Sequence, residues 1–212
     1  MHLDHVTFAA GPQGLAETTA ELSERLGTPF LDGGIHPRFG TRNMILPLAN
    51  RQYMEIVEVL EHPAAEKAAF GKAVRARSEL GGGWLCWSIA VDDITPVERM
   101  IGRHSVPGNR HRPDGFNLEW RQIGTSSMAA DPQLPQVMQW LIDPAEHPSQ
   151  MAPTDIELVA LEIAGSPQRV SDWLDEEAIS ALEQIEVRWV APNALPGITV
   201  AEFSTPGGVI RI

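Results

Sequence analysis

An imidazole and a carboxylate able to act together stand 50 positions apart, in two segments that read as strands. His5 lies in the segment from Leu3 to Ala10, and Glu55 lies in the segment from Gln52 to Leu60. Alternate side chains of a strand share a face, and the apolar faces must pack under the helix predicted for residues 13–26. We therefore expect both groups to face one concavity. Burial of the carboxylate there is costly unless it is paired or binds a cation.

Two chemistries fit this pair. One is a divalent metal site made by His5, Glu55 and a third ligand, Gln139, whose position follows from an internal repeat of the chain. Imidazole together with oxygen ligands suits Zn, Mn, Fe or Ni, and three protein ligands leave positions open for a substrate. The other is a hydrogen-bonded His–Glu pair that only satisfies two buried polar groups. The residues alone leave both open.

A second polar stretch, residues 33–43, combines three glycines, a proline and small polar residues. This composition is typical of a loop that lies close to another group. His36 in this loop is an acid–base group, a replacement metal ligand or an exposed loop histidine. Arg42 and Asn43 either hydrogen-bond a substrate or brace the loop.

Arginines gather between residues 99 and 121 of an otherwise acidic sequence. Arg110 and Arg112 are candidates for binding a substrate carboxylate, because the planar guanidinium matches a carboxylate. Solvated surface arginines are the alternative. Trp87, Trp120 and Trp140 are candidates to line a pocket for an apolar substrate, with core packing as the alternative.

The elements that must position these residues repeat along the chain. The first stretch, of about 60 residues, reads as a strand, a helix and three more strands, and the same order begins again after residues 81–83. Superposing the two series puts His5 on Trp87 and Glu55 on Gln139, at intervals of 50 and 52 residues. We predict an α+β fold.

The predicted organisation has two parts. Residues 1–148 form one domain from two modules, 1–62 and 83–148, and residues 149–212 form a third βαβββ-like module packed on it. The third module follows from another strand–helix–strand series after residue 155.

Seven short motifs are spread along residues 3–148: Leu3-Asp4-His5-Val6, Gly40-Thr41-Arg42-Asn43, Tyr53-Met54-Glu55-Ile56, Arg112-Pro113-Asp114-Gly115, Trp120-Arg121, Gln139-Trp140 and Glu146-His147-Pro148. Together they resemble the glyoxalase-like branch of the vicinal oxygen chelate superfamily. The resemblance implies paired βαβββ modules that form a cup-shaped mixed sheet around a metal. The ligands in that superfamily come from the first and last strand of each module.

At those ligand positions the chain has His5 and Glu55 in the first module, and Trp87 and Gln139 in the second. Tryptophan cannot bind a metal, and a neutral glutamine is a weak ligand. The resemblance therefore implies either a reduced set, in which His36 joins the other ligands, or a site without metal. The expected cofactor is a divalent ion or none.

The resemblance also implies a function. The first expectation is a metal-dependent lyase, isomerase or dioxygenase-type enzyme that acts on a small carboxylate- or oxygen-bearing substrate. His36 or Glu55 would move the proton, and Arg110 or Arg112 would hold a substrate carboxylate. The alternative is a non-catalytic protein that sequesters a small molecule in the same cup, against its tryptophans.

Composition limits the partners. Lysine and arginine number 16 and aspartate and glutamate 28, for a net charge of −12, which disfavours binding to nucleic acid and anionic membranes. The single cysteine, Cys86, forms no internal disulfide or thiolate zinc site and reads as a buried small hydrophobe. No signal peptide or membrane span is visible in the sequence. We expect a cytoplasmic protein with a small-molecule ligand; whether it is a monomer or a homodimer stays open.

Overall fold

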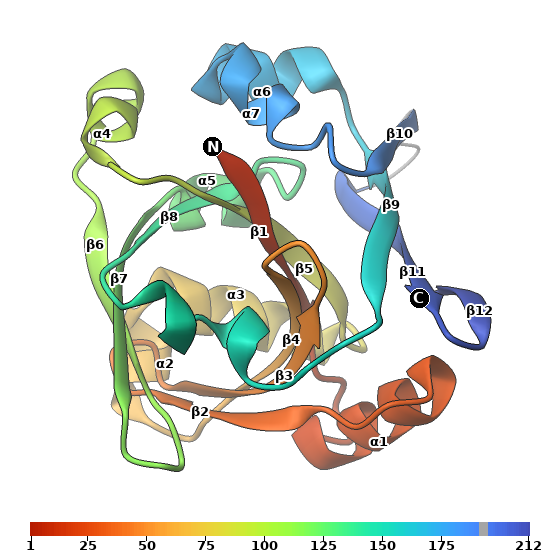
Figure 1. Cartoon of the computed structure of the whole chain (residues 1–212). Coiled ribbons are helices and arrows are strands. Elements are labelled where there is room, and N and C mark those ends of the chain that lie inside the picture. The colour runs from red at the N-terminus through yellow and green to blue at the C-terminus, as the bar shows by residue number, and fades with distance from the viewer. Residues whose placement is uncertain (191–194) are drawn as a thin grey trace.

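Most strands of the chain form a barrel (Figure 1). The structure is a computed structural model that describes residues 1–190 and 195–212. Among these residues, eight strands close in the order β1-β4-β3-β2-β6-β7-β8-β5. Their bounds are β1 His2–Ala9, β2 Leu31–His36, β3 Thr41–Leu48, β4 Gln52–Val59, β5 Gly83–Ala90, β6 Val106–His111, β7 Asn117–Ile123 and β8 Gln136–Trp140.

The barrel is built from two βαβββ modules, as the sequence predicts. In the first module β1 pairs with β4 in parallel, and in the second β5 pairs with β8 in parallel. The modules join through antiparallel pairs β1–β5 and β2–β6. The second seam is tight, because a Cβ at Gly34, where φ is +105°, would clash with the backbone carbonyl of His111. The predicted mixed sheet thus closes into a barrel.

Helices connect the strands and cover the barrel. Their bounds are α1 Leu15–Leu26, α2 Pro63–Lys67, α3 Ala69–Glu79, α4 Thr95–Ile101 and α5 Thr125–Ala130, followed by two 3₁₀ turns, Pro144–Glu146 and Pro148–Gln150. Helix α1 ends at Gly27, whose φ of 70° gives a left-handed C-cap. No helix among the described residues is long and apolar enough to cross a membrane.

A β-bulge in β1 decides which side chains face the barrel interior. The pairing of β1 with β5 shifts register between Leu3 and His5. Leu3 and Val6 therefore pack in an outer apolar cluster, whereas His5 lines the interior cavity. Strict alternation would have put Leu3 and His5 on one face, and bulges redirect side chains in this way.

Two apolar clusters of buried side chains lie on opposite sides of the barrel wall, one outside and one inside. The outer cluster joins the outer barrel face, α1 and the C-terminal module, and includes Trp87 and Phe203. The inner cluster includes Trp120 and Met138 from the strands and Phe70 from α3. Helix α3 thus packs into the barrel interior, whereas α1 packs on its outer face.

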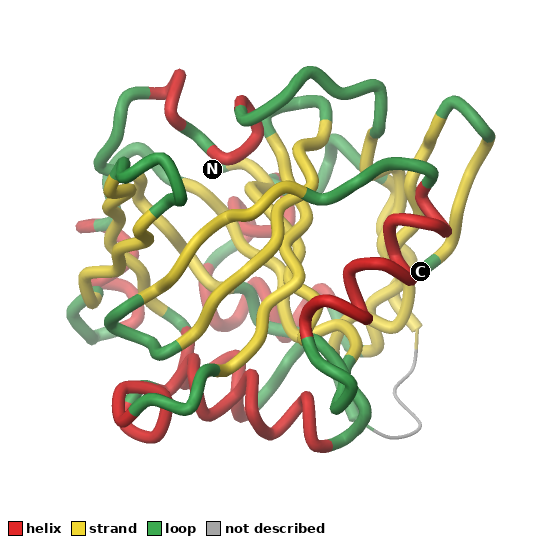
Figure 2. The backbone as a smooth tube through the Cα atoms, turned by 90° about the horizontal axis from the view of Figure 1, so that it is seen from below, coloured by secondary structure: helices red, strands yellow, loops and turns green. Residues whose placement is uncertain are grey.

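The C-terminal module has the predicted βαβββ order. It consists of β9 Glu157–Ala164, α6 Pro167–Leu174, α7 Glu176–Ser180, β10 Glu186–Val190, β11 Gly197–Thr205 and β12 Gly208–Arg211, with the sheet order β10-β9-β11-β12 among the described strands. Figure 2 shows this second sheet beside the barrel strands. The Leu3 amide donates to the Ala181 carbonyl at 3.2 Å, and Trp84 Nε1 donates to the Ile212 carbonyl at 3.1 Å. The module completes the outer core, and a domain boundary at residue 148 stays a prediction.

Candidate functional site

A small cavity of about 30 Å³ lies inside the barrel. Its walls come from both modules and from α3. The lining residues are His5, His36, Phe39, Tyr53, Glu55, Phe70, Arg110, Trp120, Gln122, Gln136, Met138 and Trp140. Since one water needs roughly 10–15 Å³ on such a measure, the cavity has room for about two waters, or for one carboxylate group.

His5 and Glu55 meet in this cavity. The Nε2 atom of His5 lies 3.9 Å from Glu55 Oε1. The carboxylate also accepts hydrogen bonds from Thr7 Oγ1 at 2.8 Å and Asn43 Nδ2 at 2.6 Å. Burial opposes ionisation of Glu55, but the neighbouring histidines and these two donors outweigh it and hold its pKa below the ordinary value. The convergence of imidazole and acid predicted from the sequence is present.

Asp4 holds His5 in place. It is fully buried next to the bulge and lies 2.6 Å from His5 Nδ1, 3.1 Å from His147 Nε2 and 3.1 Å from Trp140 Nε1. Burial opposes ionisation of Asp4, but the hydrogen bonds from the two histidines outweigh it and keep its pKa well below the ordinary value. Because His5 Nδ1 donates to this carboxylate, His5 Nε2 is the atom that faces Glu55.

Arg110 enters the cavity from β6 and is 2% exposed. Its Nε and Nη2 atoms have no hydrogen-bond partner among the described residues. Burial lowers the pKa of Arg110, and the nearby Tyr53 and Glu55 oppose that shift. Gln136 Nε2, also on the cavity wall, is a second buried donor without a partner in the described part of the chain. Unsatisfied buried donors of this kind are costly, so this side of the cavity is suited to an anion.

His36 lies on the cavity wall rather than in an exposed loop. It ends β2, is 5% exposed and has Nδ1 2.9 Å from Thr41 Oγ1. Burial lowers the pKa of His36 to about 4, with Arg110 and His5 adding to the shift and Glu55 opposing it. His36 is therefore neutral near pH 7.

Trp120 and Trp140 also line the cavity, and their ring centroids are 5.4 Å apart. Trp120 fits there because the strand residue opposite is Gly108, where a Cβ would clash with the indole. Asn43 lies one layer behind the wall, donating to Glu55.

Two predicted residues of the second module face the other way. Trp87 lies in the outer cluster, and its Nε1 donates to the Gln133 carbonyl at 3.0 Å. Gln139 points outside the barrel, where its Nε2 donates to the Asp92 carbonyl at 2.8 Å. The superposition of the two modules was out of register by one residue, and a one-residue slip moves a side chain to the opposite face. Ser88 is the residue paired with His5.

Two predicted arginines also lie outside the cavity. Arg42 is half exposed and pairs with Glu58 at 2.7 Å. Arg112 forms ion pairs with Asp114 and, at 2.7 Å, with Glu146. Arg42 lies near the start of β3, and Arg112 directly follows β6; carboxylates beside them already neutralise their charges.

Several cavity residues were not expected from the sequence. Asp4 and His147 belong to the short sequence motifs but had no predicted role, because their contact spans 143 positions. Phe39, Tyr53, Phe70, Gln122, Gln136 and Met138 complete the wall. The alternation of Gln136 and Met138 with Trp140 along β8 was the one signal available.

The cavity residues do not fit a divalent metal. No group of three His, Cys, Asp or Glu residues able to hold an ion occurs in the described part of the chain. Both oxygens of Glu55 are already held by neutral donors, and the predicted third ligand, Gln139, faces outside. Arg110 adds a positive charge to the same cavity. His36, the predicted replacement ligand, lies on the same wall, but its Nδ1 is bonded to Thr41 Oγ1, and it forms no such group with His5 and Glu55 among the described residues.

A larger chamber of about 380 Å³ adjoins the cavity. The two share Phe39, Phe70 and Gln122 in their walls. Gln122 is fixed there, because its Oε1 accepts from Trp120 Nε1 at 2.6 Å and its Nε2 donates to Thr125 Oγ1 at 2.9 Å. These three side chains therefore lie between the inner cavity and the outer chamber.

The chain has relatives at the level of family and fold. A family described as glyoxalase-like domain matches residues 3–177. Among curated proteins, no match to the sequence is found. The crystal structure of a hypothetical protein from Staphylococcus aureus is similar with a TM-score of 0.60 and 15% identity, over 100% of this chain and 85% of that one. Methylmalonyl-CoA epimerase from Mycobacterium tuberculosis gives a TM-score of 0.44 and 15% identity, over 66% of this chain and 86% of that one.

Proposed function

Because the chain belongs to the glyoxalase-like domain family, we propose that its barrel binds a small organic carboxylate and moves a proton on it without a metal. Arg110 binds the carboxylate, and His5 and Glu55 form the proton-transfer pair. The reaction class is that of an isomerase or lyase.

The observation that carries this proposal is the buried, open edge of Arg110. Nε and Nη2 are the two nitrogens on one side of the guanidinium, the edge that binds a carboxylate through two parallel hydrogen bonds. The cavity beside them has the volume of one carboxylate group. Because the cavity is buried and has aromatic walls, such a charge-assisted pair is stronger there than in water.

The proton-transfer step uses the opposite wall. The bond between the ligand's α-carbon and its hydrogen breaks, and the proton goes to His5 Nε2. The electron pair delocalises into the carboxylate held by Arg110. Asp4 orients His5 through Nδ1, and Glu55, 3.9 Å away, stabilises the imidazolium that forms. The proton then returns to the carbon, or a leaving group departs from the neighbouring carbon.

His36 supplies a neutral imidazole to the same cavity. Its depressed pKa makes it a poor base, and its ring can donate a hydrogen bond to charge that develops on the substrate. Glu55, which the sequence predicted to move the proton itself, instead supports proton transfer by His5 in this proposal.

A second candidate function is binding without catalysis. Both oxygens of Glu55 already accept hydrogen bonds from Thr7 and Asn43, and tryptophan and phenylalanine form much of the wall. These features favour a rigid site that sequesters an aromatic acid. Homodimerisation and a cytoplasmic location remain predictions from the sequence.

Calorimetric titration with a panel of small aliphatic and aromatic carboxylates tests the proposal. Arg110→Gln should weaken every hit by about 100-fold, as expected when one partner of a buried charge pair is removed. Arg112→Gln, a matched change on the next residue but one, should leave affinity within about twofold, since Arg112 lies outside the cavity. Equal affinities of the two variants would refute the site.

Hydrogen exchange at the α-carbon of the bound acid in deuterated water separates the two functions. An enzyme exchanges that hydrogen, and His5→Gln abolishes the exchange while the ligand still binds. A sequestering protein binds the acid with no exchange above the rate in buffer.

A further inference from the structure

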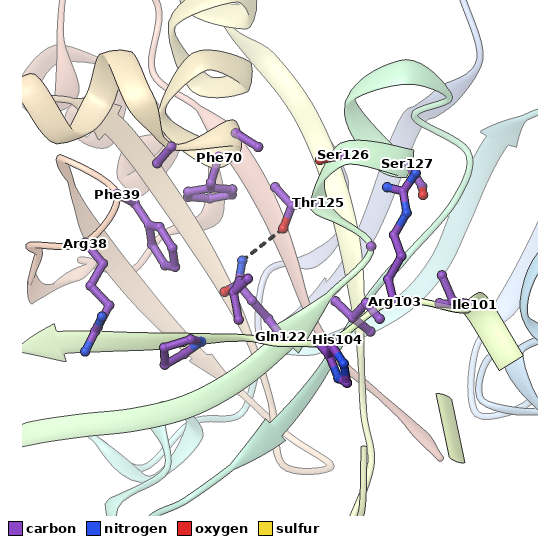
Figure 3. A pocket seen from close by; sticks show the side chains of 16 residues that line it. Arg38, Phe39, Phe70, Ile101, Arg103, His104, Gln122, Thr125, Ser126 and Ser127 are labelled. Atoms are coloured by element: carbon purple, nitrogen blue, oxygen red, sulfur yellow. Dashed lines mark hydrogen bonds between the residues drawn. The ribbon is translucent and has the colours of Figure 1, made fainter. Parts of the chain in front are cut away.

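The outer chamber lies between the start of α3, the strands β6 and β7 and the segment that begins α5. Its apolar wall includes Phe39, Phe70 and Ile123. Figure 3 shows Arg38 on one side of the chamber and Arg103 on the other, with Phe39, Phe70 and Gln122 between them. The chamber is thus an apolar space with a basic residue at each side.

The charge of this chamber is opposite to that of the protein. The chain carries a net charge of −12, yet the described residues that line the chamber include two arginines and a histidine and no Asp or Glu. Neither Arg38 nor Arg103 has an ion pair among the described side chains, whereas Arg42 and Arg121 are paired with Glu58 and Glu98. A cleft of one sign with low-dielectric walls concentrates ligands of the opposite charge.

From this arrangement we infer that the ligand is a dianion with an apolar body. One carboxylate binds Arg110 in the inner cavity, the body passes Phe39 and Phe70, and a second anionic group meets Arg38 or Arg103 in the outer chamber. The inference rests on the proposed function, because it assumes the head group at Arg110. It adds the substrate class, an extended dicarboxylate rather than a monoacid.

The direct test compares straight-chain dicarboxylates, from adipate to sebacate, with their monomethyl esters by calorimetric titration. Each pair has nearly the same length and body and differs by one charge. The wild-type protein should bind the best dicarboxylate about tenfold more tightly than its ester, the size of one partly solvated charge contact. Raising the salt concentration should reduce this preference.

Variants assign the preference to the chamber. Arg38→Gln with Arg103→Gln should remove it while leaving the affinity for the ester within about twofold, and each single change shows which arginine is responsible. Arg99→Gln removes the same charge from an exposed residue of α4 outside the chamber and should leave the preference intact.

The outcomes separate the two proposals. Retention of the preference in the double variant, or no preference in the wild type, overturns the dianion inference alone, provided that Arg110→Gln still weakens both ligands. If no dicarboxylate binds at millimolar concentration while a monocarboxylate does, the dianion inference fails alone. If Arg110→Gln changes the affinity of no carboxylate, the proposed function fails and the inference fails with it. Circular dichroism of each variant confirms that it is folded.

Discussion

The two modules share one topology but contribute opposite features to the cavity. In the first, the groups able to do chemistry are each held by hydrogen bonds: His5 by Asp4, Glu55 by Thr7 and Asn43, and His36 by Thr41. In the second, Arg110 and Gln136 present donors with no partner among the described residues. The first module is therefore a preorganised acid–base wall, and the second is a wall open to a ligand.

This difference shows that a repeated fold does not carry a repeated chemistry. The residue opposite His5 across the β1–β5 seam is Ser88, which offers neither an acid nor a metal ligand. The site is thus asymmetric even though the barrel is built from two similar halves. The contrast between the two walls can be tested by mutation, by pH and by removal of metal.

The largest expected effect comes from the network of the first module. Asp4→Asn should lower the free energy of unfolding by about 3 to 5 kcal/mol, because it disrupts a buried charge that holds two histidines and an indole. Ser88→Ala, at the facing position of the second module, should cost less than about 1 kcal/mol, since its hydroxyl has no partner among the described residues. Denaturation by urea measures both. Similar costs for the two would remove the contrast.

Acid should weaken the first module through His36. Its pKa is about 4 in the folded protein and 6.5 for an unperturbed histidine, so the unfolded chain binds the extra proton between these values. The contribution of His36 to the free energy of unfolding is therefore fully present above pH 6.5, and it falls by about 3 kcal/mol as the pH drops towards 4. His36→Gln should flatten this part of the profile. A profile of unchanged slope would show that His36 is not held neutral.

Asp4 adds a second acid-dependent contribution, at lower pH. Its folded pKa lies below that of the unfolded chain, so its stabilisation is present above the ordinary aspartate pKa and is lost as the pH falls through the folded one. The pH range in which Asp4 loses its contribution lies below that of His36. The difference in the free energy of unfolding between the wild type and the Asp4→Asn variant should therefore be smallest at the lowest pH.

Two tryptophans of the second module distinguish its inner from its outer face. Trp120→Phe should weaken carboxylate binding by about tenfold, because the indole lines the cavity and also fixes Gln122. Trp87→Phe should change the affinity by less than about twofold, since Trp87 packs in the outer cluster. The reverse order in fluorescence titration would mean that the ligand binds outside the barrel.

The smallest effect concerns metal. Dialysis against a chelator should change carboxylate affinity by less than about twofold, because no three His, Cys, Asp or Glu side chains of the described residues are placed to hold one ion. Gln136→Glu, which adds a carboxylate with little change of side-chain shape, is the matched variant and should acquire binding of one zinc or cobalt ion, detectable by elemental analysis. Stoichiometric metal in the untreated wild-type protein would contradict this interpretation.

The sequence predicted the modules, the mixed sheet and the meeting of His5 with Glu55, because alternation and element order are local patterns. It misplaced Trp87 and Gln139, because the side a strand residue faces depends on register, and the second module departs from the first by one residue. The bulge at Leu3 leaves no trace in the residue types.

Other parts of the site could not be read from the sequence for a different reason. The contacts of Asp4 with Trp140 and His147 join residues that are 136 and 143 positions apart in the sequence, and they form only when the barrel closes. From the sequence alone, Arg110 and Arg112 were equivalent candidates for binding a substrate carboxylate. Only the neighbours supplied by folding, carboxylates for Arg112 and an apolar cavity for Arg110, distinguish them.

Binding of a carboxylate by Arg110 can be seen in a crystal structure with the tightest-binding dicarboxylate. We expect one carboxylate within hydrogen-bonding distance of both Nε and Nη2 of Arg110, with the α-carbon beside His5 Nε2. Density for the ligand outside the barrel, with Arg110 unchanged and unbound, would contradict it.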